Sequence, residues 1–408
     1  IIPGGRIHNF REFMDFPRGV FKATKAPRKP FLQPIREERR VSDVVMQQDL
    51  MLHFPYHSFN PVIDLLREAA IDPDVTSIKI TAYRLAKQSK IINALINAVR
   101  NGKQVLVMLE LKARFDEEAN LAWKRRLEDE GVKVLIGIPN MKVHAKLCVI
   151  RKRVGDAIVQ YGFLSTGNLN EDTAKVYADH CLLTSNKEIM TDANRIFNYI
   201  EHYKTGNHFL KACTTLLPSP GIARREIVKM IHTEIKNAQK GLKASVCAKM
   251  NSLSDAYIIQ ELYAAAKSGV RVSLIVRGIF CMFSEDPKYV NPIHAVSIVD
   301  EYLEHARVWL FHNNGDEKMY ISSADWMVRN LDHRVEASCP ILDPDLRQEL
   351  KDILNIQLSD NSKARILDNE LKNEYVQAAA GEKSVRSQYE TYYYLQNKIE
   401  KPIEVSSH

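Results

Sequence analysis

Short apolar runs alternate with amphipathic stretches along the first half of the chain. Residues 77–83 (SIKITAY) and 104–111 (QVLVMLEL) have the apolar, partly β-branched content of strands, and residues 91–100 between them have the spacing of a helix. Asn101 and Gly102 follow, as is typical of a helix C-terminus. Strands that alternate with helices predict an α/β fold whose sheet is mixed or mostly parallel.

The same order of elements returns in the second half. Residues 244–250 and 271–276 are strand-like, and residues 258–267 have helical periodicity. Gly269 stands 167 residues after Gly102, and the helical stretches before these glycines start at the same offset, at Ile91 and Ile258. We therefore predict two tandem α/β domains related by an internal repeat.

The repeat also sets the expected domain boundaries. We expect the end of a preceding head domain at residues 1–30, a first repeat domain at 31–210, a second at 211–375 and a helical C-terminal tail at 376–408. The chain starts with Ile-Ile-Pro-Gly-Gly-Arg, without an initiator Met or the order of a signal peptide. We interpret this start as the interior of a longer protein.

The amino-acid composition indicates the class of protein but not its function. Hydrophobic residues make up 45% and charged residues 26%, a balance typical of globular proteins, and no apolar run reaches the length of a membrane span. The net charge of +7 is compatible with a polyanionic partner, although a solubilising surface explains it equally well. Six cysteines without a CxxC pair are interpreted as reduced thiols of a cytoplasmic protein.

Two histidines occupy equivalent positions of the repeat. His144 and Lys146 lie in the apolar run VHAKLCVI, and His305 and Arg307 lie in EHARVWLF. Side chains two apart on a strand share a face, so each imidazole has a cation beside it. A neutral imidazole is a competent nucleophile near pH 7, and the cation can hold the anionic group under attack. A lone strand histidine is usually a packing residue, but this pair favours a shared catalytic site.

Each histidine run is followed by a strand that ends in a polar turn, at residues 165–168 (STGN) and 322–325 (SSAD). This order resembles the phospholipase D superfamily, in which one histidine becomes phosphorylated and the other acts as acid or base. The chain departs from the phosphodiesterase pattern, because Arg151 stands where an Asp follows the first lysine and Arg307 replaces the second lysine. A phosphodiesterase or nuclease, and a non-catalytic polyanion-binding module, remain the alternative interpretations.

Longer segments resemble the C-terminal half of bacterial polyphosphate kinase. They include ITAYRLAKQSKI (80–91), KARFDEEAN (112–120), MKVHAKLCVI (141–150) and ISSADWMVRNLDHRVE (321–336). The resemblance implies reversible transfer of the ATP γ-phosphate, through a phosphohistidine, to the end of a polyphosphate chain. It further implies ATP, ADP and polyphosphate as partners, Mg²⁺, a homo-oligomer of two or four chains, no nucleic acid, and a cytoplasmic location that includes peripheral attachment to the inner membrane.

The resemblance also assigns roles to single residues. His144 matches the phosphorylated nucleophile, and His305 matches the second histidine, a general acid or base that also contacts the nucleotide phosphates. Tyr177 (KVYADH) and Arg277 (IVRGIF) match positions that bind ATP. His180, which shares the run of Tyr177, is expected to lie outside the site.

Four further cations are expected around the transferred phosphate. Lys146 and Arg307 are predicted to bind phosphate groups, because phosphoryl transfer depends on positioning and on neutralised charge. Arg84 (TAYRLA) and Arg114 (KARFDE) match arginines that the family associates with Mg²⁺. A guanidinium cannot ligate a metal ion, so we interpret both as holding phosphate oxygens that Mg²⁺ also contacts.

Overall fold

The computed structural model describes residues 30–35, 39–83, 86, 88–110, 117–370 and 372–400. The chain divides into two units, residues 1–31 and residues 32–408. Both predicted repeats and the two histidines lie in the second unit, which the following paragraphs describe. Within the described residues, no helix combines the length and the apolar content that a membrane crossing requires.

The first half of this unit forms a mixed sheet of eight strands in the order β1-β8-β7-β6-β2-β3-β4, with β13 beside β8. Its own strands are β1 (Leu50–Phe54), β2 (Val75–Ala82), β3 (Gln104–Leu109), β4 (Lys133–Ile136), β6 (Lys146–Val154), β7 (Ala157–Ser165) and β8 (Tyr177–Thr184). The helices are α1 (Val41–Gln47), α2 (Asn60–Ile71), α3 (Lys90–Arg100), α4 (Glu117–Asp129), α5 (Lys187–Glu201) and α6 (Asn207–Lys211), with a 3₁₀ turn η2 (Thr173–Lys175). Alternation along β3 fills two cores: Val107 packs with α2 and α3, whereas Leu106 and Met108 face α5.

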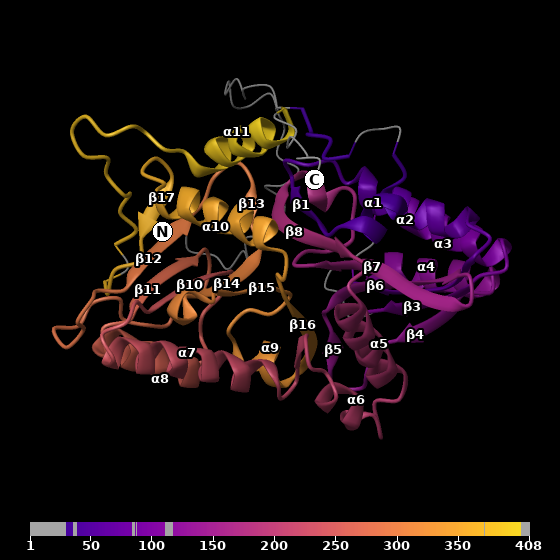
Figure 1. Ribbon diagram of the computed structural model, residues 1–408, viewed down its shortest axis with the longest axis horizontal. Coiled ribbons are helices and arrows are strands. Elements are labelled where there is room, and N and C mark those ends of the chain that lie inside the picture. Colours follow the sequence, from indigo (N-terminus) through magenta and orange to yellow (C-terminus); the bar gives the residue numbers. More distant parts are fainter. Residues whose placement is uncertain are drawn as a thin grey trace, which may run out of the picture. The chain divides into compact units, whose positions relative to one another are not determined.

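The second half forms a sheet of nine strands in the order β17-β12-β11-β10-β14-β15-β16-β5, with β9 beside β16. Its own strands are β9 (Leu217–Ser219), β10 (Ser245–Met250), β11 (Arg271–Val276), β12 (His294–Ile298), β14 (Arg307–Phe311), β15 (Lys318–Ser322), β16 (Arg334–Pro340) and β17 (Ala364–Ile366). The helices are α7 (Ala223–Gln239), α8 (Ala256–Lys267), α9 (Val328–Asp332), α10 (Pro344–Leu358) and α11 (Ser387–Glu400), with a 3₁₀ turn η3 (Asn313–Gly315). Helices α7 and α8 cover one face of this sheet, and α10 and α11 lie on the other (Figure 1).

The predicted elements are present, with small differences at their ends. The strand expected at 271–276 has those bounds, whereas the strand expected at 77–83 starts at Val75 and that at 104–111 ends at Leu109. The helix expected from residue 258 starts two residues earlier, because the Asp255 side chain accepts a hydrogen bond from the backbone nitrogen of Ile258 and caps it. Each sheet is mixed: β2, β3 and β4 are parallel, and β6, β7 and β8 are antiparallel.

Each half lends a two-residue strand to the sheet of the other half. β5 (Lys142–Val143) pairs in parallel with β16, and β13 (Leu303–Glu304) pairs in parallel with β8. One apolar core also includes side chains from both sheets, among them Leu164. Since each lent strand ends directly before one of the two predicted histidines, both histidines are held at the junction of the two sheets.

The cysteines agree with the expectation of reduced thiols. All six are free, and all but Cys281 are buried or half-buried. Burial raises the pKa of the Cys247 thiol to about 12, so that thiol stays protonated at neutral pH. The five cysteines other than Cys281 therefore contribute to the packing, and the candidate chemistry rests on other side chains.

Candidate active site

His144 is fixed between the two domains by its backbone and by its ring. The backbone nitrogens of His144 and Ala145 both donate to the carbonyl oxygen of Val335, at 2.8 and 2.9 Å. The ring Nδ1 lies 2.9 Å from Oε2 and 3.0 Å from Oε1 of Glu336. An ionised carboxylate only accepts hydrogen bonds, so Nδ1 carries the proton and the lone pair of the imidazole lies on Nε2.

His305 repeats this geometry with the two halves exchanged. The backbone nitrogens of His305 and Ala306 both donate to the carbonyl oxygen of Ala178, at 3.0 and 2.8 Å. The ring Nδ1 lies 2.8 Å from Oδ2 and 3.0 Å from Oδ1 of Asp179. Each imidazole is therefore oriented by a carboxylate of the opposite domain, which leaves the lone pair on Nε2. At His305 that nitrogen also lies 3.3 Å from Nη1 of Arg307.

Further donors hold the two carboxylates in place. Ser323 Oγ and Asn330 Nδ2 donate to Glu336, the latter at 2.9 Å, and Thr166 Oγ1 donates to Asp179 at 2.6 Å. Gly167 packs so closely that an added Cβ would lie 2.0 Å from Oδ2 of Asp179. The polar turns that follow the two histidine strands thus supply the supports of both carboxylates, and one of them needs a glycine.

A tyrosine ring stands beside each imidazole. The Tyr83 ring meets His144 edge to face at a centroid distance of 5.1 Å, and the Tyr177 ring lies 5.3 Å from His305. Tyr177 is the residue predicted to contact ATP, and the structure places it at the site. Tyr83 was not predicted, although it directly precedes the predicted Arg84.

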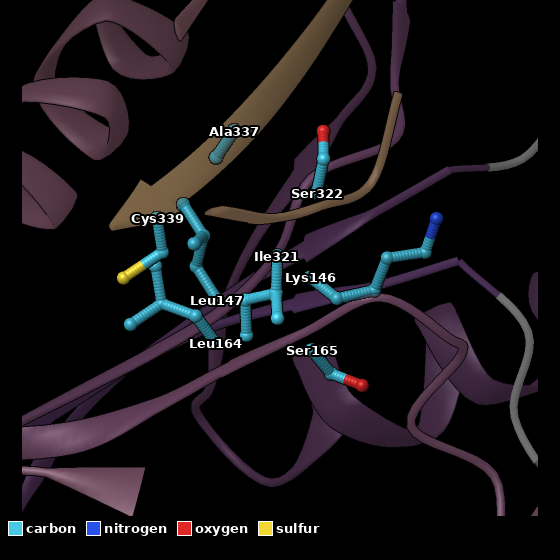
Figure 2. A pocket seen from close by; sticks show the side chains of 8 residues that line it. All are labelled: Lys146, Leu147, Leu164, Ser165, Ile321, Ser322, Ala337 and Cys339. Carbon is cyan, nitrogen blue, oxygen red and sulfur yellow. The ribbon is translucent and has the colours of Figure 1, made fainter. Parts of the chain in front are cut away.

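Lys146 is a buried cation whose ammonium group no hydrogen bond engages within the described residues. Its side chain is among the largest buried ones, with 2% of the residue exposed, and Nζ has no hydrogen-bond acceptor. The ammonium lies 5.6 Å from the centroid of the Tyr83 ring. Figure 2 shows the amine extending away from Leu164 and Cys339, apolar residues that line a small cavity beside it. Burial lowers the pKa of Lys146 to about 7.

Burial also decides the charge of both imidazoles. It lowers the pKa of His144 well below the ordinary value, with further lowering from the charges of Lys146 and Arg307 and a smaller part from His305. The pKa of His305 is lowered by burial as well, against the opposing effect of Asp179. Both rings are therefore neutral at pH 7, and they lie close enough for the charge of one to act on the other.

The two predicted arginines of the second domain also lie at the site. Arg307 is buried, donates from Nε to Oδ1 of Asp325 at 3.1 Å, and donates from Nη1 to the carbonyl oxygens of His305 at 2.9 Å and Thr166 at 3.3 Å. Arg277 is half-buried and donates from Nε to Oδ1 of Asn251 at 2.7 Å. Arg307 thus contributes positive potential from a fixed position, while Arg277 makes its one side-chain hydrogen bond to the described residues through Nε.

The predictions for Mg²⁺ are not tested. Arg84 and Arg114 lie outside the described residues. Within the described part of the chain, no three His, Cys, Asp or Glu side chains gather into a group that could hold a metal ion. Asp179 and Glu336, the two carboxylates of the site, both engage imidazoles.

Asp179 and Glu336 are the functional residues that the sequence analysis missed. They occupy equivalent positions of the repeat, in the runs ADHC and VEAS, and each is the acidic residue of an otherwise largely apolar strand. That pairing was a usable signal, because a carboxylate is rarely placed in a buried strand without a partner. Which histidine each carboxylate meets depends on the exchanged strands, which the sequence does not show.

The two tandem α/β domains agree with the expected phospholipase D-like fold. Phosphatidylserine synthase from Haemophilus influenzae superposes with a TM-score of 0.52 at 11% identity, over 86% of this chain and 94% of that one, a likeness of fold alone. Polyphosphate kinase from Porphyromonas gingivalis superposes with a TM-score of 0.85 at 41% identity, over 92% of this chain and 57% of that one.

Residues 40–206 match the family model of polyphosphate kinase C-terminal domain 1, and residues 216–388 match that of C-terminal domain 2. Polyphosphate kinases of Klebsiella pneumoniae and Escherichia coli K12 are 45% and 44% identical over 98% of this chain. The chain belongs to the polyphosphate kinase family. It spans 58% of the length of these two relatives.

Proposed function

We propose that this chain carries the phosphoryl-transfer centre of a polyphosphate kinase, with His144 as the residue that carries the phosphoryl group. The carrying observation is the orientation of His144: Nδ1 faces Glu336, so the nucleophilic lone pair lies on Nε2. The family relationship, the second oriented imidazole and the buried cation beside them support the same reaction. The substrates are Mg²⁺–ATP and inorganic polyphosphate, and the transfer is reversible.

In the first step, Nε2 of His144 attacks the γ-phosphorus of ATP. The N–P bond forms, the bond from phosphorus to the β–γ bridging oxygen breaks, and ADP leaves with that electron pair. The ring then carries positive charge, which Glu336 stabilises through Nδ1. His144 lies between β5 and β6, and Lys146, two residues later, begins β6. Among the described residues the ammonium group of Lys146 has no hydrogen-bond partner, so it can bind the transferring phosphoryl oxygens.

In the second step, a terminal oxygen of polyphosphate attacks the phosphorus on His144, and the N–P bond breaks to restore the imidazole. His305 is neutral and has its lone pair on Nε2, so it starts this step as the base that accepts a proton from an incoming phosphate oxygen. In the reverse direction the protonated ring is the acid. Asp179 stabilises that charged form.

Binding of the nucleotide is assigned to the half-buried side chains at the edge of the site. Tyr177 lies against the His305 ring, and Arg277 has a single engaged nitrogen among its described contacts. Mg²⁺ enters with ATP and neutralises its phosphates, with Arg84 and Arg114 assigned to the same oxygens by resemblance. A homo-oligomer of two or four chains, the exclusion of nucleic acid and a cytoplasmic location with peripheral membrane attachment stay predictions.

Incubation with labelled ATP tests this function. With Mg²⁺ and ATP labelled at the γ-phosphate, we expect the chain to acquire a label that is labile in acid and stable in base. Added ADP should return the label to ATP, and added polyphosphate should carry it into the polymer.

ATP labelled at the α-phosphate is the matched control and should leave the chain unlabelled, because only the terminal phosphoryl group moves. An unlabelled chain that instead hydrolyses bis(p-nitrophenyl) phosphate would show a phosphodiesterase. If the chain acquired no label but bound polyphosphate with an affinity that falls as the salt concentration rises, it would be a binding module.

A further inference from the structure

The C-terminal helix α11 holds the segment that ends at His305. Gln388, near the start of α11, is 1% exposed and lies against residues 302–304. Its Nε2 donates to the carbonyl oxygen of Tyr302 at 2.9 Å and to Oε1 of Glu304 at 2.7 Å, and its Oε1 accepts from the backbone nitrogen of Tyr302 at 2.9 Å. One side chain thus fixes both the backbone and the side chain of the turn that presents His305.

Glu304, the residue before His305, is a buried carboxylate with three partners. It forms an ion pair with Lys249 of β10, and Gln357 of α10 donates to its Oε2 at 3.1 Å. The third partner is Gln388. Two elements later than His305 in the chain therefore determine where the residue beside the imidazole can sit.

The same helix reaches the partner of His305 by a second route. His180 follows Asp179, and its Nδ1 lies 2.8 Å from Nδ1 of His53 in β1. Nε2 of His53 lies 2.7 Å from Oε1 of Glu349 in α10, and Lys398 of α11 forms an ion pair with Oε2 of that carboxylate at 2.6 Å. His180 is thus outside the pair that does the chemistry, as expected, but it belongs to a buried chain of contacts that ends on α11.

The His144–Glu336 pair has different supports. Glu336 is held by Ser323, directly after β15, and by Asn330 in α9, and the backbone of His144 is held by Val335. The two imidazoles therefore make equivalent contacts with a carboxylate, but different residues hold the two imidazole–carboxylate pairs in place. Figure 1 shows α11 beside α10, on the face of the second sheet opposite α7 and α8.

We propose that α11 is a positioning element for the His305–Asp179 pair, with Gln388 and Lys398 as its positioning residues. Gln388 acts through Glu304 on the backbone of His305, and Lys398 acts through the Glu349–His53–His180 contacts on the strand that carries Asp179. The inference rests on the proposed function, because it assigns these residues to the acid–base step. Helix α11 thereby influences the protonation and the ring orientation of His305, and it leaves His144 unaffected.

The test compares Gln388→Ala with the matched control Gln396→Ala, on the same helix, whose side chain bonds to Glu400. Each protein is labelled with ¹⁵N-histidine, and the ring nitrogens of His305 and His144 are assigned with His305→Gln and His144→Gln variants. We expect Gln388→Ala to shift the His305 ring resonances and its titration, and to leave those of His144 as in the wild type. Gln396→Ala should change neither ring.

Lys398→Met tests the second route at a position where folding is not at risk, because this lysine is 42% exposed. It should move the His305 titration in the same sense as Gln388→Ala, and Lys398→Arg should restore it. In the transfer assay, Gln388→Ala should lower kcat about tenfold to a hundredfold with little change in the KM for ATP, since small misplacement of a reacting group has costs of this size. In a protein that already carries His305→Gln, adding Gln388→Ala should not lower kcat any further.

Unchanged His305 resonances in Gln388→Ala and Lys398→Met would overturn the inference, and so would equal shifts of both rings, which would show a general loosening of the fold. The spectra report on His305 whether or not the chain turns over. A wild type that never takes up phosphate would therefore contradict the proposed function and leave the positioning result to be judged on its own.

Discussion

Glu336 of the second domain and His144 of the first meet at 2.9 Å, and the reciprocal contact between Asp179 and His305 has the same form. The exchanged strands β5 and β13 cause this crossing, because each ends one residue before a histidine and pairs one residue before a carboxylate. Neither domain alone supplies both the imidazole and the carboxylate of either pair. The site exists only when both repeats are folded and docked.

Glu336→Gln should abolish most phosphorylation of His144 while leaving the fold intact. The amide is nearly isosteric, but its nitrogen donates to Nδ1 and thereby favours the tautomer with the proton on Nε2. The nucleophilic lone pair is then turned away from the phosphorus. We expect the single-turnover rate of labelling from ATP to fall by about 10²-fold or more, on the scale seen when an orienting carboxylate is lost.

Asp179→Asn separates the two histidines. It changes the tautomer of His305 only, so the proton transfer to and from phosphate oxygens should suffer while the nucleophile keeps its orientation. We expect turnover to fall by about 10²-fold, as for the loss of a general acid or base. Rapid-quench measurement of phosphoenzyme formation and decay should show a slower transfer to polyphosphate. A larger loss in labelling than with Glu336→Gln would contradict the assigned roles.

Lys146→Met should inactivate the protein and stabilise it at pH 7. Burial lowers the pKa of Lys146 from 10.5 to about 7, which means that the folded chain holds this proton less well than the unfolded chain. Stability is therefore penalised below pH 7 and recovers between pH 7 and 10.5, by on the order of a few kcal/mol. Chemical unfolding at pH 7 and pH 9 should show a rise with pH in the wild type that is missing in the variant. If the free energy of unfolding rose equally with pH in the wild type and the variant, the pKa of Lys146 would not be lowered by burial.

The pH dependence of kcat/KM should be a narrow bell with its maximum near pH 7. Burial raises the pKa of Glu336 to about 7, so on the acid side the carboxyl is protonated and no longer orients His144. On the alkaline side Lys146, whose pKa is also about 7, loses the charge that binds phosphate. Bound phosphate holds that proton, so the alkaline limb of kcat should lie at higher pH than that of kcat/KM. A value of kcat/KM that stays constant between pH 6 and 8 would show that neither Glu336 nor Lys146 controls activity in this range.

The sequence predicted what its repeats and local patterns encode. Strand and helix order, the mixed sheets and the two histidines followed from periodicity and from matching positions, and the described structure contains them. The cross-domain carboxylates could not be derived, because β5 and β13 are two residues long and carry no periodic signal. The role of Gln388 could not be predicted either, because a polar residue on a C-terminal helix is expected to be exposed to solvent. Only the tertiary structure shows the turn against which it packs. Long-range pairing of this kind depends on tertiary structure rather than on local pattern.

The most direct measurement is mass spectrometry of the chain after brief exposure to Mg²⁺ and ATP, under conditions that preserve phosphohistidine. The account predicts one added phosphoryl group on the peptide that contains His144, attached at Nε2. That group should be absent in His144→Ala and present in His305→Ala. A phosphoryl group on His305, or equal phosphorylation of His144→Ala and the wild type, would contradict the account.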